Sequence, residues 1–243
     1  MAPRPRVARL LAILGPLLVA GCGSRYGATR SASEQGDDIL GLWRGLFWVA
    51  AIIGALVMGL ILWAVFRYRH RGPVEELPAQ THSNIPLEIF YTAVPLLIVV
   101  VLFSVNVVTQ NRVTKLSDHP DVRVEVTAFQ WQWRFRYVQE DITIVGDLEH
   151  PPTLVLPVNR TVRLKLRTTD VIHSFYVPAF LEKRDLIPGV DNQIDVRPNR
   201  VGRFVGHCAE FCGLAHDRMG FDVETLTPAA FDRWARAKRG RAA

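Results

Sequence analysis

The chain has 243 residues, a formal net charge of +6 and 49% hydrophobic residues, so its length suits one ordinary domain with additional segments. The positive charge alone would suggest a nucleic-acid partner. However, the hydrophobic residues are concentrated before Asn111 and the N-terminus has the pattern of a secretion signal, so we expect a membrane protein and no nucleic-acid partner.

The first 21 residues have the features of a secretory signal. Three arginines precede the apolar run 10–20, which ends in small residues directly before Cys22. A cysteine after the sequence VAG resembles a bacterial lipobox, which implies cleavage before Cys22 and acylation of its thiol. An ordinary signal cleaved nearby, with Cys22 incidental, is the alternative. Residues 22–40 are rich in Gly, Ser and charge and are expected to form a flexible tether.

Residues 41–110 contain two apolar runs, each long enough to cross a bilayer as a helix. We expect transmembrane helices over about 43–67 and 85–108, joined by a loop that contains the sequence RYRHR. Clustered arginine in a short loop beside membrane helices marks the cytoplasmic side. The prediction is therefore a helical hairpin in a bacterial cell membrane, with the rest of the chain on the extracytoplasmic side. Buried core helices of a soluble protein are the alternative, which the scarcity of charge in both runs disfavours.

Residues 111–226 have the pattern of a β-rich domain. Val122–Ala128 and Thr161–Arg167 alternate apolar and polar residues with the period of a half-buried strand, and Trp131–Val138 alternates large and charged residues. Recurrent Pro and Gly between such segments predict the short strands of a sandwich or barrel. Residues 227–243 are expected to form a closing helix, with Thr-Pro at its start, and a basic tail.

The sequence HCAEFCGLAHDRM, residues 207–219, gathers two thiols, two imidazoles and a thioether. A disulfide between Cys208 and Cys212 is possible outside the cytoplasm, but it leaves His216 and Met219 unexplained. Zinc sites use Cys, His and carboxylates, and Met is not among their ligands. Thiolate, imidazole and thioether together are the ligands of copper electron-transfer sites.

Such copper sites take a further histidine from an earlier strand, and His173 in the sequence DVIHSF offers it. The second thiol departs from a site for one copper ion, and because two thiolates can bridge two metals, a dinuclear copper centre is the preferred hypothesis. Soft ligands and imidazoles suit electron transfer without an open coordination position. His207 adjoins Cys208, but on a strand its side chain points to the opposite face, so we do not expect it to be a ligand.

The pattern C-x3-C-x3-H-x2-M from Cys208 to Met219, with DVIHSF upstream, resembles the copper A domain of cytochrome c oxidase subunit 2. The sequences QWQW at residues 130–133 and IPG at 187–189, and LEI at 87–89 with a later proline, occur in the order that this family has. The resemblance covers most of the chain after the signal.

The resemblance implies a two-helix transmembrane hairpin that carries an all-β, cupredoxin-like Greek-key barrel. It also implies that the side chain of Glu210 reaches a magnesium ion at the boundary with the catalytic subunit, although a solvated carboxylate is the alternative. The implied copper ligands are Cys208 and Cys212 as bridges, His173 and Met219 on one copper, and His216 and the carbonyl of Glu210 on the other.

The implied function is that of subunit 2 of a haem-copper oxidase. Such a subunit accepts electrons from cytochrome c at copper A and passes them to the haem of subunit 1, where oxygen reduction is coupled to proton translocation. Trp131 would be the point of electron entry and Glu88 the entrance of a proton path, whereas core packing and a helix-dipole contact are the respective alternatives. Asp170 would help to dock the donor, and the nearly balanced charge of the outer domain predicts weak steering.

Two other classes share parts of this pattern. A membrane-anchored copper chaperone of the Sco type has Cys-x3-Cys and a distant histidine, but in a thioredoxin-like fold, normally with one membrane helix and without the later His-x2-Met. A quinol oxidase subunit 2 shares the hairpin and barrel but lacks the copper ligands, all of which occur in this sequence.

Overall fold

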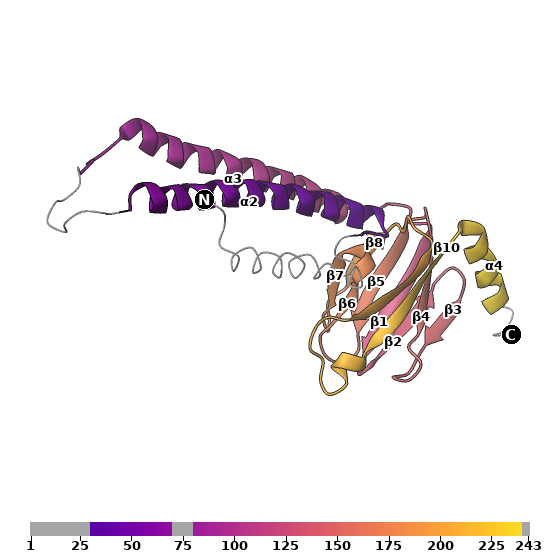
Figure 1. Ribbon diagram of the computed structural model, residues 1–243. Coiled ribbons are helices and arrows are strands. Elements are labelled where there is room, and N and C mark those ends of the chain that lie inside the picture. The colour runs from indigo at the N-terminus through magenta and orange to yellow at the C-terminus, as the bar shows by residue number, and fades with distance from the viewer. Residues whose placement is uncertain (1–29, 70–79, 240–243) are drawn as a thin grey trace, which may run out of the picture. The chain divides into compact units, whose positions relative to one another are not determined.

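The computed structural model describes residues 30–69 and 80–239, drawn in colour in Figure 1. The chain divides into two compact units, one formed by residues 38–115 and the other by the described residues on either side of that segment. The predicted signal peptide over 1–21, the predicted lipidation site at Cys22 and the last residues of the predicted basic tail lie outside the described residues.

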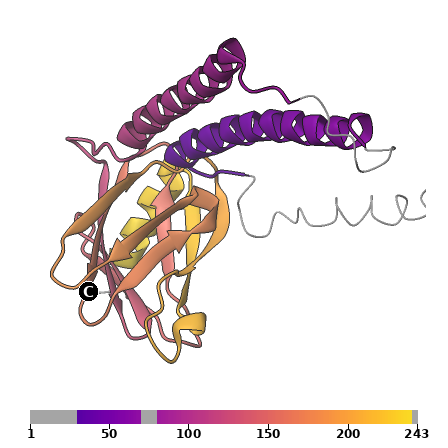
Figure 2. The same cartoon turned by 90° about the vertical axis from the view of Figure 1, so that its left-hand side faces the viewer.

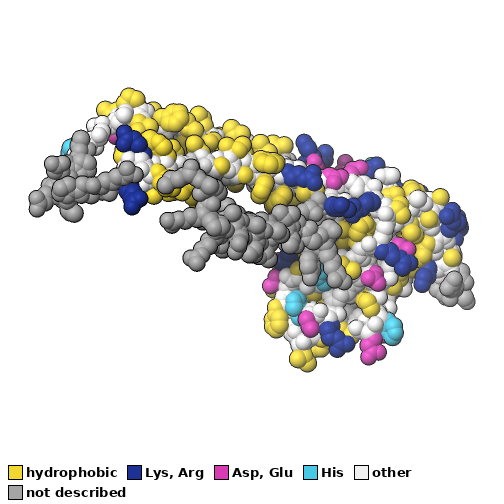
Figure 3. All heavy atoms as spheres, in the orientation of Figure 1, with side chains coloured by type: hydrophobic (Ala, Val, Ile, Leu, Met, Phe, Trp, Pro, Cys, Tyr) yellow, Lys and Arg dark blue, Asp and Glu magenta, His cyan; other side chains and the backbone are white. Residues whose placement is uncertain are grey.

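Two long apolar helices confirm the predicted membrane segment. Helix α2 spans Glu34–Arg67 and helix α3 spans Ile85–Val113, and both are long and apolar enough to cross a bilayer. From Leu46 onward their large apolar side chains are mostly exposed, as with Trp48 at 64% and Phe66 at 75%. Figure 3 shows the same apolar surface along these helices. Core helices of a soluble protein would bury such side chains. The alternative that these runs are buried core helices therefore does not agree with the structure.

The start of α3 is capped by two reciprocal hydrogen bonds. The side chain of Asn84 accepts a hydrogen bond from the backbone N–H of Leu87, and the carboxylate of Glu88 accepts one from the backbone N–H of Asn84 at 3.0 Å. Both bonds satisfy backbone donors that have no partner inside the helix. Glu88 therefore has a capping role in the structure.

The flexible tether predicted over 22–40 is wrong for its described part. Ala32 and Ser33 are buried, the N–H of Ala32 donates to the carbonyl of Ala179 at 2.7 Å, and Ser33 forms a β-bridge with Pro198. Helix α2 then begins at Glu34, nine residues before the predicted span, because the hydroxyl of Ser33 accepts the N–H of Gly36. Apolar runs locate the lipid-crossing part of a helix, and polar caps decide where it begins.

The β-rich domain is a sandwich of two five-stranded sheets (Figures 1 and 2). The first sheet has the order β3-β2-β1-β5-β8, and the second has the order β4-β10-β9-β6-β7. Helix α4, Pro228–Arg239, follows the last strand as predicted. The strands are β1 Val122–Phe129, β2 Gln132–Tyr137, β3 Ile142–Val145, β4 Thr153–Pro157, β5 Val162–Thr168, β6 His173–Val177, β7 Glu182–Leu186, β8 Asn192–Val196, β9 Gly202–Cys208 and β10 Gly220–Leu226.

The apolar alternation of the predicted strands fills the space between the sheets. Along β1 and β5 every second residue is buried, and the parallel register places Val124 beside Leu164. On the other sheet, Phe221 and Phe175 stack with ring centroids 5.0 Å apart, and Trp133 of β2 meets Phe221 edge-on at 5.1 Å. These aromatic contacts join the two sheets and form the rigid core below one end of the sandwich.

A tight turn joins the two alternating segments predicted over Val122–Ala128 and Trp131–Val138. Phe129 ends β1 and pairs with Gln132 of β2, so Gln130 and Trp131 form the turn of an antiparallel hairpin. Trp133 is fully buried, whereas Trp131 is only partly buried against the core. The sequence carries no Gly or Pro between the two segments, so no turn residue marks this reversal of the chain.

Candidate metal centre

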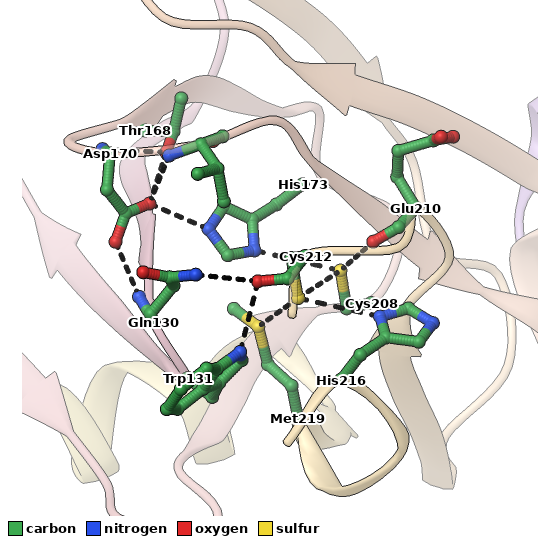
Figure 4. Close-up of polar contacts among 11 residues, drawn as sticks. Gln130, Trp131, Thr168, Asp170, His173, Cys208, Glu210, Cys212, His216 and Met219 are labelled. Carbon is green, nitrogen blue, oxygen red and sulfur yellow. Dashed lines mark hydrogen bonds and ion pairs between the residues drawn. The ribbon is translucent and has the colours of Figure 1, made fainter. Parts of the chain in front are cut away.

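The topology brings the predicted ligands to one end of the sandwich. β6 begins at His173, β9 ends at Cys208, and these two strands pair so that Phe175 lies opposite Cys208. β10 begins directly after Met219, so the segment 209–219 is the loop between two paired strands. Residues 35 or more positions apart in sequence thereby lie within one site (Figure 4).

Two thiols occupy the middle of the site. The Sγ atoms of Cys208 and Cys212 are 3.8 Å apart, and both cysteines are free and buried. A disulfide requires an S–S distance of about 2.05 Å, so the disulfide alternative is not met. Three further donor atoms surround the thiols. The Nδ1 of His173 lies 3.8 Å from Cys208 Sγ. The Nδ1 of His216 and the Sδ of Met219 lie 3.5 Å and 3.7 Å from Cys212 Sγ.

Glu210 presents different groups in two directions. Its backbone carbonyl oxygen lies 3.2 Å from Cys208 Sγ, whereas its carboxylate lies 3.3 Å from the ammonium of Lys183. Figure 4 shows the carbonyl pointing toward the sulfurs and the carboxylate pointing away from them. The backbone carbonyl of Glu210 therefore lies beside the thiols, and its carboxylate does not.

The chemistry of the donors fits copper. Ligand atoms of His173, Cys208 and Cys212 all lie within 4.8 Å of one another, and all three residues are buried. The buried thioether of Met219 is the fourth donor, and zinc sites do not use thioethers, whereas copper sites do.

Asp170 holds the ring of His173 in place. Its Oδ1 lies 2.9 Å from His173 Nε2, which turns Nδ1 toward Cys208, and the same oxygen accepts the backbone N–H of Val171. Its Oδ2 accepts the backbone N–H of Gln130 at 2.7 Å. A carboxylate behind a ligating histidine fixes the ring orientation and raises ligand basicity. Both carboxylate oxygens of Asp170, the residue expected to help dock the donor, therefore accept hydrogen bonds within the domain.

The thiols and imidazoles bias one another's protonation. Burial raises the pKa of Cys208, but hydrogen bonds with His173 and nearby backbone lower it to about 6. Burial and the negative charge on Cys208 raise the pKa of Cys212 to about 12. Burial lowers the pKa of His173, yet its contacts with Cys208 and Asp170 outweigh this and leave that pKa raised. One thiolate is therefore favoured already, and forming the second beside it requires added positive charge.

The turn between β1 and β2 contacts the ligand loop directly. The indole Nε1 of Trp131 donates to the carbonyl oxygen of Cys212 at 3.1 Å, and the side-chain amide of Gln130 donates to the same oxygen at 2.8 Å. Gln130 was not among the expected site residues. Its place in the QWQW sequence was the available signal, but no spacing rule links that sequence to the cysteine loop.

The remaining expected residues lie apart from this centre. His207 is exposed and meets the ring of Tyr176 edge-on at 5.1 Å, which confirms that it faces away from Cys208. Glu88 lies in the other compact unit, and Cys22 lies outside the described residues.

Family models match both parts of the chain. Residues 24–107 match the transmembrane domain of cytochrome c oxidase subunit II, and residues 138–226 match its periplasmic domain. A probable cytochrome c oxidase subunit 2 from Streptomyces coelicolor is 36% identical, with 98% of this chain and 90% of that protein covered. Cytochrome c oxidase subunit 2 from Mycobacterium tuberculosis is 32% identical, with coverage of 78% and 68%.

A solved structure is also similar. The periplasmic domain of subunit II of cytochrome oxidase from Bradyrhizobium japonicum has 27% sequence identity and a TM-score of 0.48, and the match covers 53% of this chain and 100% of that one. The family matches, with the two apolar helices and the two-sheet domain, establish the predicted hairpin and cupredoxin-like fold.

The contact between Asp170 and His173 yields a prediction for metal affinity. Asp170→Asn keeps an acceptor for the imidazole N–H but removes the charge, so copper affinity should fall by about 10- to 100-fold. Competition titration of the full chain against a copper chelator measures the change. Asp222→Asn, an exposed carboxylate on β10, is the matched control. Equal affinities for the two variants would show that Asp170 does not support the ligand.

Proposed function

This chain belongs to the cytochrome c oxidase subunit II family, and from that premise we propose that it is the electron-entry subunit of a haem-copper oxidase. It accepts electrons from a cytochrome c and passes them to the haem of the catalytic subunit, where oxygen reduction is coupled to proton translocation. The observation that carries this proposal is the pair of buried thiols 3.8 Å apart, flanked by two imidazoles and a thioether.

The six donors would hold two copper ions in the order that the family suggests. The proposed ligands are Cys208 and Cys212 as bridges, His173 and Met219 on one ion, and His216 with the Glu210 carbonyl on the other. Copper bound in this way supplies a carrier of single electrons that needs no change of ligands between its oxidation states. The chain's own contribution is to hold these donors at the end of the sandwich, with His173, both cysteines and Met219 buried and His216 half-buried.

Electrons would enter through Trp131. The indole is partly buried against the core, and its N–H bonds directly to the backbone of Cys212. An aromatic group at this position offers the donor an apolar contact next to a ligand residue. Asp170 would act on docking only indirectly, because its oxygens are engaged with His173 and Gln130.

The membrane arrangement is part of the same proposal. The arginine-rich loop after α2 favours a cytoplasmic turn, which puts the copper domain on the extracytoplasmic side. Cleavage before Cys22 and its acylation would add a lipid anchor to the two helices. The Glu210 carboxylate, directed away from the sulfurs, would share a magnesium ion with the catalytic subunit, and Glu88 would open a proton path into it.

The copper-chaperone alternative does not fit the fold. A thioredoxin-like domain alternates helices and strands, whereas this domain has two five-stranded sheets and, in its described part, a single closing helix after the last strand. Two membrane helices and the complete set of donors also favour the oxidase subunit.

Electron paramagnetic resonance of the copper-loaded full chain tests the function most simply. An unpaired electron shared through Cys208 and Cys212 should couple to two equivalent copper nuclei, with two coppers bound per chain. Cys208→Ser or Cys212→Ser should abolish that signal, whereas Met219→Leu should keep copper and shift the reduction potential, because the thioether ligand is weak. The four-line pattern of a single copper nucleus would overturn the dinuclear assignment.

A second prediction concerns Trp131. Trp131→Gln should retain the copper signal but slow reduction by cytochrome c by about tenfold or more, the loss typical of removing a tryptophan anchor from an interface. Stopped-flow reduction of the assembled oxidase measures this, and a small artificial donor serves as the control that needs no docking. If cytochrome c reduces the variant at the normal rate, electrons enter elsewhere and Trp131 only packs.

A third prediction separates the two roles of Glu88. Glu88→Gln keeps an acceptor for the N–H of Asn84 but cannot carry a proton, whereas Glu88→Ala loses both functions. If Glu88 opens a proton path, both variants should lower oxygen turnover severalfold while electron transfer into copper is unchanged. Normal turnover of the assembled Glu88→Gln oxidase would leave the carboxylate with its capping role alone.

A further inference from the structure

Besides the pairing of β6 with β9, a hydrogen-bonded connection through the side chains of Asp170 and Gln130 joins the two segments that carry the metal ligands. The backbone N–H of Gln130 donates to Asp170 Oδ2 at 2.7 Å, and Asp170 in turn holds the ring of His173. The side-chain amide of the same residue donates to the carbonyl of Cys212 at 2.8 Å. Figure 4 shows the resulting path from His173 through Asp170 and Gln130 to Cys212.

The carbonyl of Cys212 has a second donor from the same turn. The indole N–H of Trp131 reaches it at 3.1 Å, so two N–H groups converge on one oxygen. A carbonyl oxygen has two lone pairs and accepts both bonds. The positive ends of two N–H dipoles are thereby directed at the backbone of a residue whose sulfur lies in the centre of the site.

Gly213 makes this close approach possible. Its φ of +115° is a conformation that side chains rarely allow, and a Cβ there would lie 3.1 Å from Gln130 Nε2 and 3.3 Å from Trp131 Nε1. The backbone conformation therefore favours glycine, and a side chain here would have to displace Gln130 and Trp131 by a few tenths of an ångström. Gly213, directly after Cys212, therefore allows Gln130 and Trp131 to approach the ligand loop closely.

These contacts have an electrostatic consequence for the centre. In the proposed copper site, reduction would add one negative charge near Cys208 and Cys212, and N–H dipoles that point at a ligand residue stabilise added negative charge. The same contacts hold the Cys212 loop at a fixed distance from His173. Removing a donor should therefore favour the oxidised state and loosen the loop.

We propose that Gln130 is a positioning residue that couples the two ligand-bearing segments and raises the reduction potential of the centre through its bond to the Cys212 carbonyl. Trp131 donates the second hydrogen bond to the same carbonyl oxygen. The part of this proposal that concerns potential rests on the proposed copper site, whereas the part that concerns the loop does not require metal.

The test uses the full chain purified in detergent, with variants of two neighbouring glutamines. Gln130 is exposed, and Gln130→Leu removes its amide at similar side-chain size, whereas Gln130→Glu replaces the donor with a negative charge. Gln132→Leu is the matched control, because its half-buried side chain makes no hydrogen bond within the described part of the chain. Trp131→Phe removes the other donor and keeps an aromatic ring.

Potentiometric titration of the copper-loaded chains is the first measurement. The potential should fall in Gln130→Leu and in Trp131→Phe, fall further in Gln130→Glu, and stay at the wild-type value in Gln132→Leu, with copper content unchanged. Wild-type potential in Gln130→Leu, or an equal fall in Gln132→Leu, would overturn the proposal.

Amide hydrogen exchange of the copper-free chains is the second measurement, and it separates this proposal from the copper assignment. Loss of one such hydrogen bond should speed exchange in the segment 209–219 by about two- to tenfold in Gln130→Leu and leave it unchanged in Gln132→Leu. Unchanged protection in Gln130→Leu would overturn the coupling even if the wild-type chain binds two coppers. Failure of the wild type to bind copper, with faster exchange in Gln130→Leu, would overturn the copper site alone.

Discussion

Two buried thiols 3.8 Å apart impose the constraint that the rest of the domain satisfies. Ionising both would place two negative charges together in a poorly solvated place, which is unfavourable without nearby positive charge. The pKa of Cys208 is accordingly lowered and that of Cys212 is raised, so one thiol ionises more easily than the other. An imidazole beside each thiol and, in the proposed function, two copper cations resolve it. The site is therefore a place where metal binding and thiol ionisation support each other.

The sandwich keeps the donors from relaxing away from this arrangement. Register fixes His173 and Cys208 at the ends of paired strands, and the indole N–H of Trp133 bonds to the carbonyl of Met219 at 3.4 Å. Below them, Trp133, Phe175 and Phe221 pack through ring contacts that join the sheets. A centre that carries electrons benefits from such support, because ligands that stay in place between oxidation states cost little reorganisation.

Much of this could be predicted from sequence because the signals were local. The spacing from Cys208 to Met219 lies within one loop, the two apolar runs exceed the length of a bilayer crossing, and β1 and β5 alternate cleanly. The misses were matters of tertiary contact. No local sequence pattern indicates that Ala32 and Ser33 pack on the sandwich, that the chain reverses at Gln130, or that Asp170 contacts His173. The start of α2 and the end of α3 were also missed, because caps rather than hydropathy set them, whereas the end of α2 at Arg67 and the start of α3 at Ile85 agree with the prediction.

Anomalous diffraction from crystals of the copper-loaded chain, recorded at the copper absorption edge, tests the central claim most directly. The account predicts two copper peaks between the sulfurs of Cys208 and Cys212, each within bonding distance of both, with His173 on one side and His216 on the other. A single peak, or copper bound away from the two sulfurs, would contradict it.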